Sequence, residues 1–257
     1  MNASALRRRA GAPAGIAVVL AVWTLLAVTV LHDDGAVPTP WAMLTRLVDD
    51  GWTFYEPHVR ATGWEALRGF MWGNALAIGC ALLVVLVPFL ERVVTQLAVA
   101  SYCLPVIAVG PILTVILDDD SPIVALSALS CFFTTLTGAL SGLRAADRTS
   151  LDLVRAYGGG RWQELRRVRI TAALPGTLAA LRIAAPAAVL GAIIGEYMGR
   201  VEEGLGVAMI VSQQQLVADR TWGVAMVAAA LAGIGFAAVA LLARVATPWA
   251  PRTGASS

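Results

Sequence analysis

DLVRAYGGGRWQELRRVRITAALPGTLAALRIA, residues 152–184, is the stretch of sequence that decides the fold. Its first half is rich in charge and is interrupted by three consecutive glycines, Gly158–Gly160, and its second half opens a long apolar run. Glycine takes positive φ at little cost and commonly ends helices. The pattern therefore predicts two short helices, about 150–157 with Ser150 as N-cap and about 161–170, joined by a glycine turn and ending at Leu174-Pro175-Gly176.

The rest of the chain is much more apolar than a soluble domain. Hydrophobic residues make up 58% and charged residues 14% of the 257 positions, with a mean hydropathy of +0.73, whereas soluble domains carry about 25% charged residues. A membrane-spanning helix needs about 20 mostly apolar residues. The sequence predicts an all-α, polytopic membrane protein with six transmembrane helices, at 15–31, 69–90, 94–117 (interrupted by Pro105, Gly110 and Pro111), 122–143, 178–198 (with Pro186 inside) and 222–245.

The distribution of arginine predicts the orientation in the membrane. Every basic residue is an arginine, and seven of them lie between Arg144 and Arg169. Because arginine is enriched on the cytoplasmic side, the N-terminal tail 1–14, the loop 144–175 and the C-terminal tail 247–257 are expected inside the cell. Acidic residues gather in the opposite loops, which agrees with this orientation: Asp33, Asp34, Asp49, Asp50, Asp118–Asp120, Glu202, Glu203 and Asp219. We expect a multi-pass protein of the inner or plasma membrane.

The predicted outer loop 32–63 contains a helix signal of its own. Thr39 is a suitable N-cap and Pro40 suits the first helical position. The residues that follow place apolar side chains on one stripe, which predicts a short amphipathic helix lying at the membrane surface: Trp41, Leu44, Leu47 and Val48. The same loop holds both histidines, His32 and His58, near several acids, and a solvated loop explains them better than a metal site does.

Several functional classes are excluded by what the sequence lacks. A phosphate-binding P-loop requires a lysine, and the chain has none, so any ATPase that drives it is another polypeptide. The three cysteines, Cys80, Cys103 and Cys131, lie in apolar runs without metal-ligand spacing and are expected to be buried hydrophobic residues. No catalytic residue, metal or cofactor is expected, and no nucleic-acid partner.

Small and polar residues within the spans indicate helix packing and a few pathway candidates. Glycines recur four apart, a spacing that lets helices approach closely: Gly69/Gly73, Gly138/Gly142 and Gly191/Gly195/Gly199. Arg182 and Glu196 lie near opposite ends of the fifth span, about 21 Å apart along a helix, so they cannot pair. Each is expected to reach its nearer membrane surface, or Glu196 lines the outer mouth of a pathway, with Asn74, Gln213 and Gln214 as weaker candidates.

The order of residues resembles the cytoplasmic EAA loop of ATP-binding-cassette (ABC) importer permeases, in particular the nitrate/sulfonate/taurine type. Asp152 stands at the glutamate position of that motif and Leu153 and Val154 at the alanines. Gly158 matches the motif's glycine, and Leu174-Pro175 matches its second Leu-Pro, although Thr171 replaces an expected proline. The resemblance extends over about residues 40–245 through WEALRGFMWGNALAIG (64–79), LPVIAVGPILTVIL (104–117), GLRAADRTSLDLVRAYG (142–158) and GEYMGRVEEGLGVAMIVSQQQLVADRTW (195–222).

The resemblance implies a type I importer bundle, with residues 64–246 as the permease domain, and a mechanism. The loop would dock on a separate ATP-binding subunit and couple ATP hydrolysis to rocking of the bundle. It implies an extracytoplasmic solute-binding protein and a second permease, identical or related, as further partners, and a small solute such as a sulfonate, nitrate, taurine or a vitamin precursor. The loop residues expected to carry the coupling are Asp152, Leu153, Val154, Arg155, Ala156, Gly158, Arg161 and Trp162.

Two other classes of protein stay open at this point. A self-contained secondary transporter or channel would show an internal repeat with broken helices and several buried charges. A membrane scaffold or sensor would explain the spans but not a helix–glycine–helix loop of fixed length.

Overall fold

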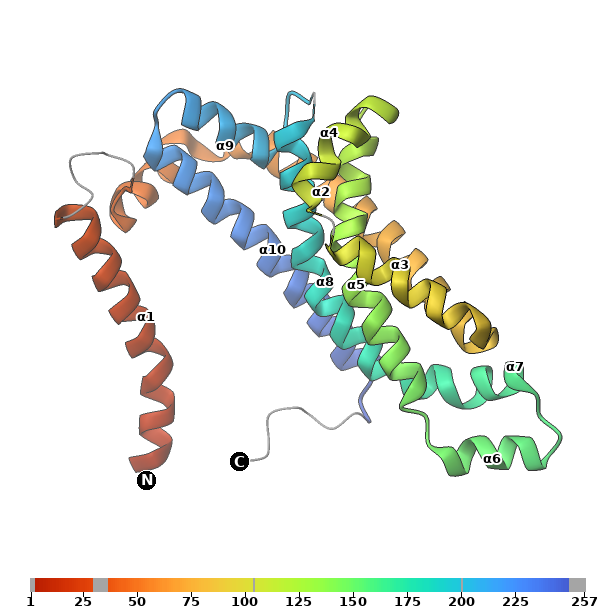
Figure 1. The fold of residues 1–257 in the computed structure, drawn as a ribbon. Coiled ribbons are helices and arrows are strands. Elements are labelled where there is room, and N and C mark those ends of the chain that lie inside the picture. Colours follow the sequence, from red (N-terminus) through yellow and green to blue (C-terminus); the bar gives the residue numbers. More distant parts are fainter. Residues whose placement is uncertain (1–2, 30–36, 104, 200, 250–257) are drawn as a thin grey trace.

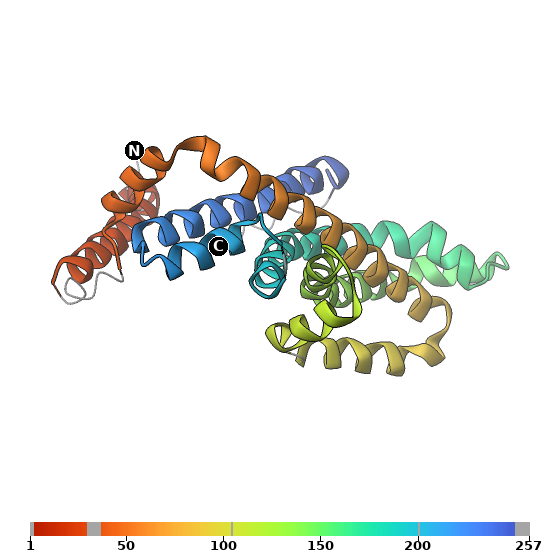
Figure 2. The same ribbon diagram turned by 90° about the horizontal axis from the view of Figure 1, so that it is seen from above.

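The described residues form an all-helical protein in which a bundle of long helices carries a helical loop at one end (Figure 1). The computed structural model describes residues 3–29, 37–103, 105–199 and 201–249. The sequence features at His32, Asp33, Asp34, Arg200 and Arg252, and the last residues of the first predicted span, lie outside these ranges. The first helix, α1 (Ala3–Thr29), stands beside the bundle, on the side opposite to the loop (Figures 1 and 2).

The predicted amphipathic helix and second span are joined in a single element, α2 (Pro40–Leu86). The Thr39 cap is confirmed, because its hydroxyl accepts a hydrogen bond from the backbone N–H of Ala42 at 3.2 Å and Pro40 begins the helix. A kink occurs at Gly51, which has φ +67°, a conformation that favours glycine. No separate loop therefore divides the two predicted segments; one residue changes the helix direction.

The predicted third span is divided between two helices. A short 3₁₀ turn (Pro88–Leu90) follows α2 and leads into α3 (Glu91–Cys103), and α4 (Val106–Ile116) begins after Pro105. The break at Pro105 is confirmed, whereas α4 continues through Gly110 and Pro111. Helices in apolar surroundings tolerate an internal proline because neighbouring groups satisfy the freed backbone.

Helix α5 (Ser121–Arg144) lies between α2 and α8 (Ile170–Met198) and packs closely on both. The glycine pairs make this approach possible, which confirms the packing prediction. A side chain at Gly69 or Gly73 would collide with α5, and one at Gly142 would collide with the α8 backbone around Ala173. The three helices thus form the centre of the bundle, with α9 (Leu205–Gln214) and α10 (Ala218–Ala246) added against α8 and α2.

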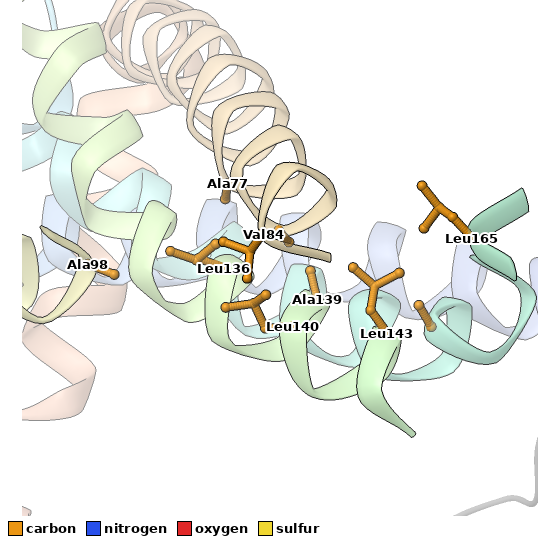
Figure 3. Packing of buried hydrophobic residues seen from close by; sticks show 10 residues of the cluster. Ala77, Val84, Ala98, Leu136, Ala139, Leu140, Leu143 and Leu165 are labelled. Carbon is orange, nitrogen blue, oxygen red and sulfur yellow. The ribbon is translucent and has the colours of Figure 1, made fainter. Parts of the chain in front are cut away.

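The largest apolar cluster lies where the bundle meets the loop (Figure 3). Ala77 and Val84 of α2 pack on Leu136 and Leu140 of α5, and Ala98 of α3 covers one side. Leu165, from the loop itself, belongs to the same cluster and is almost fully buried. The loop is therefore anchored in the core and does not hang free from it.

Four of the described helical segments are long and apolar enough to cross a membrane: Pro40–Leu86, Ser121–Arg144, Arg161–Met198 and Ala218–Ala246. They contain the fourth, fifth and sixth predicted spans and most of the second, whose last residues, 87–90, lie beyond α2. The first and third predicted spans correspond to shorter apolar helices, Gly15–Thr29 and Val106–Ile116.

Candidate functional site

The loop between α5 and α8 begins with a capped helix, α6 (Arg148–Ala156). Its N-cap is Asp147 and not Ser150 as predicted from the sequence. The Asp147 carboxylate accepts hydrogen bonds from the backbone N–H of Ser150 at 2.9 Å and from its hydroxyl at 3.0 Å. These two bonds lower the pKa of Asp147 below its ordinary value of 3.8, because they favour the ionised carboxylate. Ser150 thus lies inside the first turn and serves the cap as a donor.

The predicted glycine turn is confirmed, and its three glycines differ in backbone conformation and in the space around them. Only Gly158 has positive φ, at +79°, and its N–H donates to Arg155 O at 2.8 Å. Gly159 N–H donates to Val154 O at 2.9 Å, and a side chain at Gly159 would collide with Val154. Gly160 is the N-cap of the next helix and has open space around it. The turn reverses the chain within three residues.

The second short helix does not end where the sequence predicted. An α-helical turn, α7 (Arg161–Glu164), passes into a π-helical segment (Leu165–Arg169), and α8 follows without a break. Pro175 lies inside α8 and does not end the helix. The loop is therefore continuous with a membrane-spanning helix, so a displacement of α7 is passed directly to α8.

A buried carboxylate holds the two arms of the loop together. Glu164 is only 4% exposed, and its Oε1 accepts from Arg155 Nε at 2.7 Å while its Oε2 lies 3.4 Å from Arg169 Nη2. Arg169 also donates to the carbonyl of Leu143, at the end of α5, at 3.4 Å. Charge-assisted bonds of this kind are among the stronger hydrogen bonds in proteins. Glu164 thereby connects α6, the π-helical segment and α5.

Three large apolar side chains point outward from this braced loop. Leu153 is 59% exposed, Tyr157 85% and Trp162 63%. Leu153 lies in α6, Tyr157 directly follows it and Trp162 lies in α7, and these two helices project from the bundle (Figure 1). Contiguous exposed apolar groups can mark interaction sites. We refer to Leu153, Tyr157 and Trp162 below as the tip residues.

The structure brings the predicted coupling residues together on this loop, although two of them have internal partners. Arg155 binds Glu164 and also Asp152, whose Oδ1 lies 3.3 Å from Arg155 Nη1. Arg161 Nη1 donates to the carbonyl of Leu86, the last residue of α2, at 3.4 Å. Val154 is half-buried beneath the turn, and the other members of the predicted set are exposed: Asp152, Leu153, Ala156, Gly158 and Trp162.

The predicted pathway residues do not converge on one surface. Asn74 is buried between α2 and α5, where it donates to Phe70 O at 2.6 Å and accepts from the Thr135 hydroxyl. Gln213 and Gln214 are exposed at the end of α9. Their role in a pathway stays a prediction.

Glu196 does not reach the membrane surface as predicted, because it is 2% exposed. Its Oε1 accepts from the Thr62 hydroxyl at 2.5 Å, and its Oε2 accepts from the backbone N–H of Gly206 at 2.5 Å. A side chain at Gly204 or Gly206 would occupy the space that the carboxylate fills. This cluster connects α2, α8 and the start of α9 at the end of the bundle remote from the loop. Arg182, the other charge of this span, lies over the Phe236 ring at 4.1 Å.

An apolar cavity of about 470 Å³ opens among α4, α8, α9 and α10. None of the four predicted pathway residues lines it. Its walls are aliphatic apart from one tyrosine, one proline and one methionine: Ile107, Pro186, Val189, Leu190, Ile193, Ile194, Tyr197, Met209, Ala228, Ala229 and Ala232.

Sequence reasoning missed Glu164, Thr62 and His58 as organising residues. His58 accepts a hydrogen bond at Nδ1 from the backbone N–H of Gly204 at 3.1 Å, so it is a helix residue with a partner and not part of a solvated loop. Among the described residues no group of histidine, cysteine and acidic side chains could hold a metal ion. The spacing of His58, Thr62 and Glu65, on one helix face, was a signal that could have found this cluster.

Comparison with known proteins identifies the family. Residues 73–248 match the family model described as "Binding-protein-dependent transport system inner membrane component". The formylaminopyrimidine transport permease protein ThiX of Halalkalibacterium halodurans is 30% identical over 90% of this chain and 92% of its own length. The putative aliphatic sulfonates transport permease protein SsuC of Bacillus subtilis is 24% identical over 95% of this chain and 90% of its own.

A solved structure shares the fold. The MetNI methionine ABC transporter in an inward-facing conformation aligns with a TM-score of 0.62, covering 73% of this chain and 93% of that chain at 19% identity. The relatives are permease subunits of multi-component systems, which removes the alternatives of a self-contained carrier and of a scaffold. The chain belongs to the family of binding-protein-dependent transport system inner membrane components, and it is the multi-pass permease subunit of an ABC importer that works with an ATP-binding subunit and a solute-binding protein.

Proposed function

We propose that the loop from Arg144 to Pro175 is the surface on which the ATP-binding subunit docks, with the tip residues as its apolar contacts. The main support for this proposal is that Leu153, Tyr157 and Trp162 are exposed on a loop whose two arms are held together by Glu164. A pre-organised apolar surface loses little conformational freedom when it binds. Asp152, Ala156 and Gly158 supply the exposed surface between the apolar contacts.

In this proposal Arg155 and Arg161 also brace the loop from inside, through the partners that the structure gives them. Arg155 holds α6 against Glu164, and Arg161 ties α7 to the end of α2. A push on the tip would therefore reach α2 through Arg161 and α8 through the continuous helix. This arrangement supports mechanical coupling by a loop that moves as one body.

Co-purification with the ATP-binding subunit tests the docking proposal. Leu153→Arg and Trp162→Ala should lower the yield of the complex by about tenfold, the effect of losing about 1.4 kcal/mol at an interface. Trp41→Ala is the matched control, because Trp41 is equally exposed but lies at the remote end of α2. Recovery of the subunit by both loop variants at the wild-type level would refute the assignment.

We further propose a neutral solute with an aromatic ring, of the vitamin-precursor type, over nitrate, taurine or a small sulfonate. The residues that line the 470 Å³ cavity carry no charge, and Tyr197 supplies one aromatic face. Small-molecule sites are mostly apolar, with few polar groups, and fall in this size range. ThiX, a formylaminopyrimidine permease by name, is more similar to this chain than the sulfonate permease SsuC is.

Uptake by the reconstituted importer tests the solute class. Vesicles containing the complete complex should accumulate a labelled formylaminopyrimidine and not taurine. Ile194→Trp, which fills the cavity, should reduce uptake about tenfold while the ATP-binding subunit still co-purifies, since the loop is untouched. Accumulation of taurine alone would overturn the ring assignment.

A second permease completes the pathway in this proposal, either another copy of this chain or a related one. The exposed apolar faces of α4 and α8, around Ile107, Ile112 and Leu190, support such a pairing within the membrane. Mass measurement of the intact complex distinguishes the outcomes: two copies, two different permeases, or one permease, of which the last contradicts the proposal.

A further inference from the structure

Two buried acids face each other at the remote end of the bundle. Glu65 of α2 is 5% exposed and Glu196 of α8 is 2% exposed, and the two carboxyl groups lie close enough to interact. A carboxylate can only accept hydrogen bonds, whereas a protonated carboxyl can donate one. A hydrogen bond between two carboxyl groups therefore requires that one of them holds a proton.

The surrounding donors indicate which of the two is ionised. The Thr62 hydroxyl and the Gly206 backbone N–H both donate to Glu196. The Thr62 oxygen in turn accepts from the backbone N–H of Leu205 at 2.8 Å. Two donors are thus directed towards Glu196, and the bond from Leu205 orients the Thr62 hydroxyl as one of them, which is the pattern expected around a carboxylate.

Glu65 has the opposite environment. Its Oε2 is buried and finds no hydrogen-bond donor among the described residues. An ionised carboxylate left in this position would be costly, because burial strongly disfavours an unpaired charge. A neutral Glu65 that donates to Glu196 leaves no charge without a partner.

Other charged groups near the pair do not replace that proton. Arg68, one turn further along α2, is occupied by Asp120 at the start of α5 in an ion pair. His58 uses Nδ1 to accept from Gly204, and Glu203, in the loop before α9, is exposed. The charged groups that act on Glu65 are thus Arg68 and Asp120, and Glu203 acts on His58 next to the pair.

We propose that Glu65 and Glu196 form a proton-binding carboxyl pair that holds α2, α8 and the start of α9 together at the remote end of the permease. In this pair the bound proton forms a hydrogen bond between the Glu65 and Glu196 carboxyl groups, and Glu196 carries the connection on to the backbone of Gly206. Loss of the proton places two negative charges side by side in a buried site, where like charges repel strongly. This end of the bundle is therefore held closed by a proton and loosens as the pH rises.

The sign of the pH effect follows from the proton count. In the unfolded chain both glutamates ionise above about pH 4.3, whereas the folded pair keeps one proton. The folded state then binds one proton more, so its stability falls as the pH rises through the range in which the pair keeps that proton. This dependence of stability on pH is the reverse of that expected for a carboxylate in an ion pair, which loses stability as the pH falls.

Infrared spectroscopy of the purified full chain in lipid nanodiscs tests the proton directly. The wild-type protein at neutral pH should show the C=O stretching band of a protonated carboxyl, and Glu65→Gln should remove it. Glu202→Gln, an exposed acid in the same region, is the matched control and should leave the band unchanged. A wild-type spectrum without that band, or a band that survives in Glu65→Gln, would overturn the proposal.

Thermal unfolding of the same samples tests the consequence. An amide at position 65 is neutral at every pH and can still donate to Glu196. The unfolding midpoint of wild type should therefore fall relative to that of Glu65→Gln by about 3–5 °C per pH unit between pH 5 and the pH at which the pair ionises. Parallel curves for the two proteins would contradict the idea, as would a wild-type midpoint that depends on Na⁺ at constant ionic strength, since a metal ion would then take the place of the proton.

Glu65→Leu covers the case in which Glu65→Gln does not fold. Leucine removes the charge and the donor together, so the carboxyl band should be absent and the unfolding midpoint should be lower than that of wild type at pH 5 and insensitive to pH above it. A Glu65→Leu protein that keeps the band, or that keeps the pH dependence of wild type, refutes the assignment of the proton to Glu65.

Discussion

Arg155 Nε donates to Glu164 Oε1 at 2.7 Å across the glycine turn, so the two arms of the loop between α5 and α8 are joined by an ion pair whose acid is buried. The arginine is on the exposed side, with 57% of its side chain accessible. This pair braces the loop from which the tip residues project.

Glu164→Gln should loosen the loop without unfolding the bundle. The change removes the carboxylate that binds Arg169 and leaves Arg155 with Asp152 as its remaining acidic partner. The loss of stability should be modest, because Arg155 is largely exposed and screened by solvent. Hydrogen exchange at 148–169 should accelerate, and ATP hydrolysis stimulated by the binding protein should fall.

Asp152→Asn is the control for that experiment. Asp152 contacts the same arginine at 3.3 Å but is itself exposed, so the exchange rates in the loop should barely change. Equal acceleration in both variants would show that the buried position of Glu164 has no special role.

The glycine turn provides a matched pair of variants that differ only in backbone conformation. Gly158 has φ +79° and Gly160 has φ −90°, and both have open space where a side chain would go. Gly158→Ala should destabilise the loop by about 1–2 kcal/mol, because a Cβ disfavours the left-handed conformation. Gly160→Ala should be close to neutral. Hydrogen exchange of residues 153–164 measures both, and equal effects would contradict the argument.

The Asp147 cap predicts an acid-sensitive first turn of α6. The hydrogen bonds from Ser150 lower the pKa of Asp147 in the folded state, so the cap contributes fully above the ordinary pKa of an aspartate and is lost as the pH falls through the lowered value. Exchange protection of residues 148–152, corrected for the intrinsic pH dependence of exchange, should be constant from pH 7 to pH 5 and should decline below about pH 4. Asp147→Asn, which still caps helices but does not titrate, should abolish that decline; a decline that persists there would assign it to another group.

Helix packing in the bundle centre depends on Gly142 more than on glycines that face outward. A side chain at Gly142 would meet the α8 backbone at Ala173, whereas Gly79 of α2 has open space. Overpacking of this kind typically costs about 1–3 kcal/mol. Gly142→Val should therefore lower the thermal unfolding midpoint in detergent by several degrees, and Gly79→Val should not. A stable Gly142→Val protein would mean that α5 and α8 can separate freely.

Local signals in the sequence predicted local structure well. Thr39-Pro40 starts α2, Pro105 separates α3 from α4, and Gly158 takes the positive φ of the turn. Each feature depends on the conformational preferences of one or two neighbouring residues. The same reasoning chose Ser150 over Asp147 as the cap of α6, because both residue types cap helices and only the observed bond from Ser150 N–H to Asp147 decides between them.

The buried polar groups could not be predicted in this way. Thr62 and Glu196, which share a 2.5 Å hydrogen bond, are 134 positions apart in the chain. Glu196 at the end of an apolar run has the same sequence appearance whether it reaches the membrane surface or is enclosed by backbone N–H groups. The prediction that the second short helix ends at Pro175 was also wrong, since α8 continues through this residue. The effect of a proline on a helix depends on the groups that surround it.

The part of α2 that follows its kink has a mechanical consequence for transport. From Glu65 to Leu86 the helix runs about 32 Å, with Glu65 in the acid pair at one end and the carbonyl of Leu86 bound by Arg161 of the loop at the other. A rotation of α2 by about 10° about its Leu86 end would carry Glu65 sideways by about 5–6 Å, given that length. That displacement exceeds any hydrogen-bond length, so a small rotation of the helix, transmitted from the loop through Arg161, is enough to separate Glu65 from Glu196.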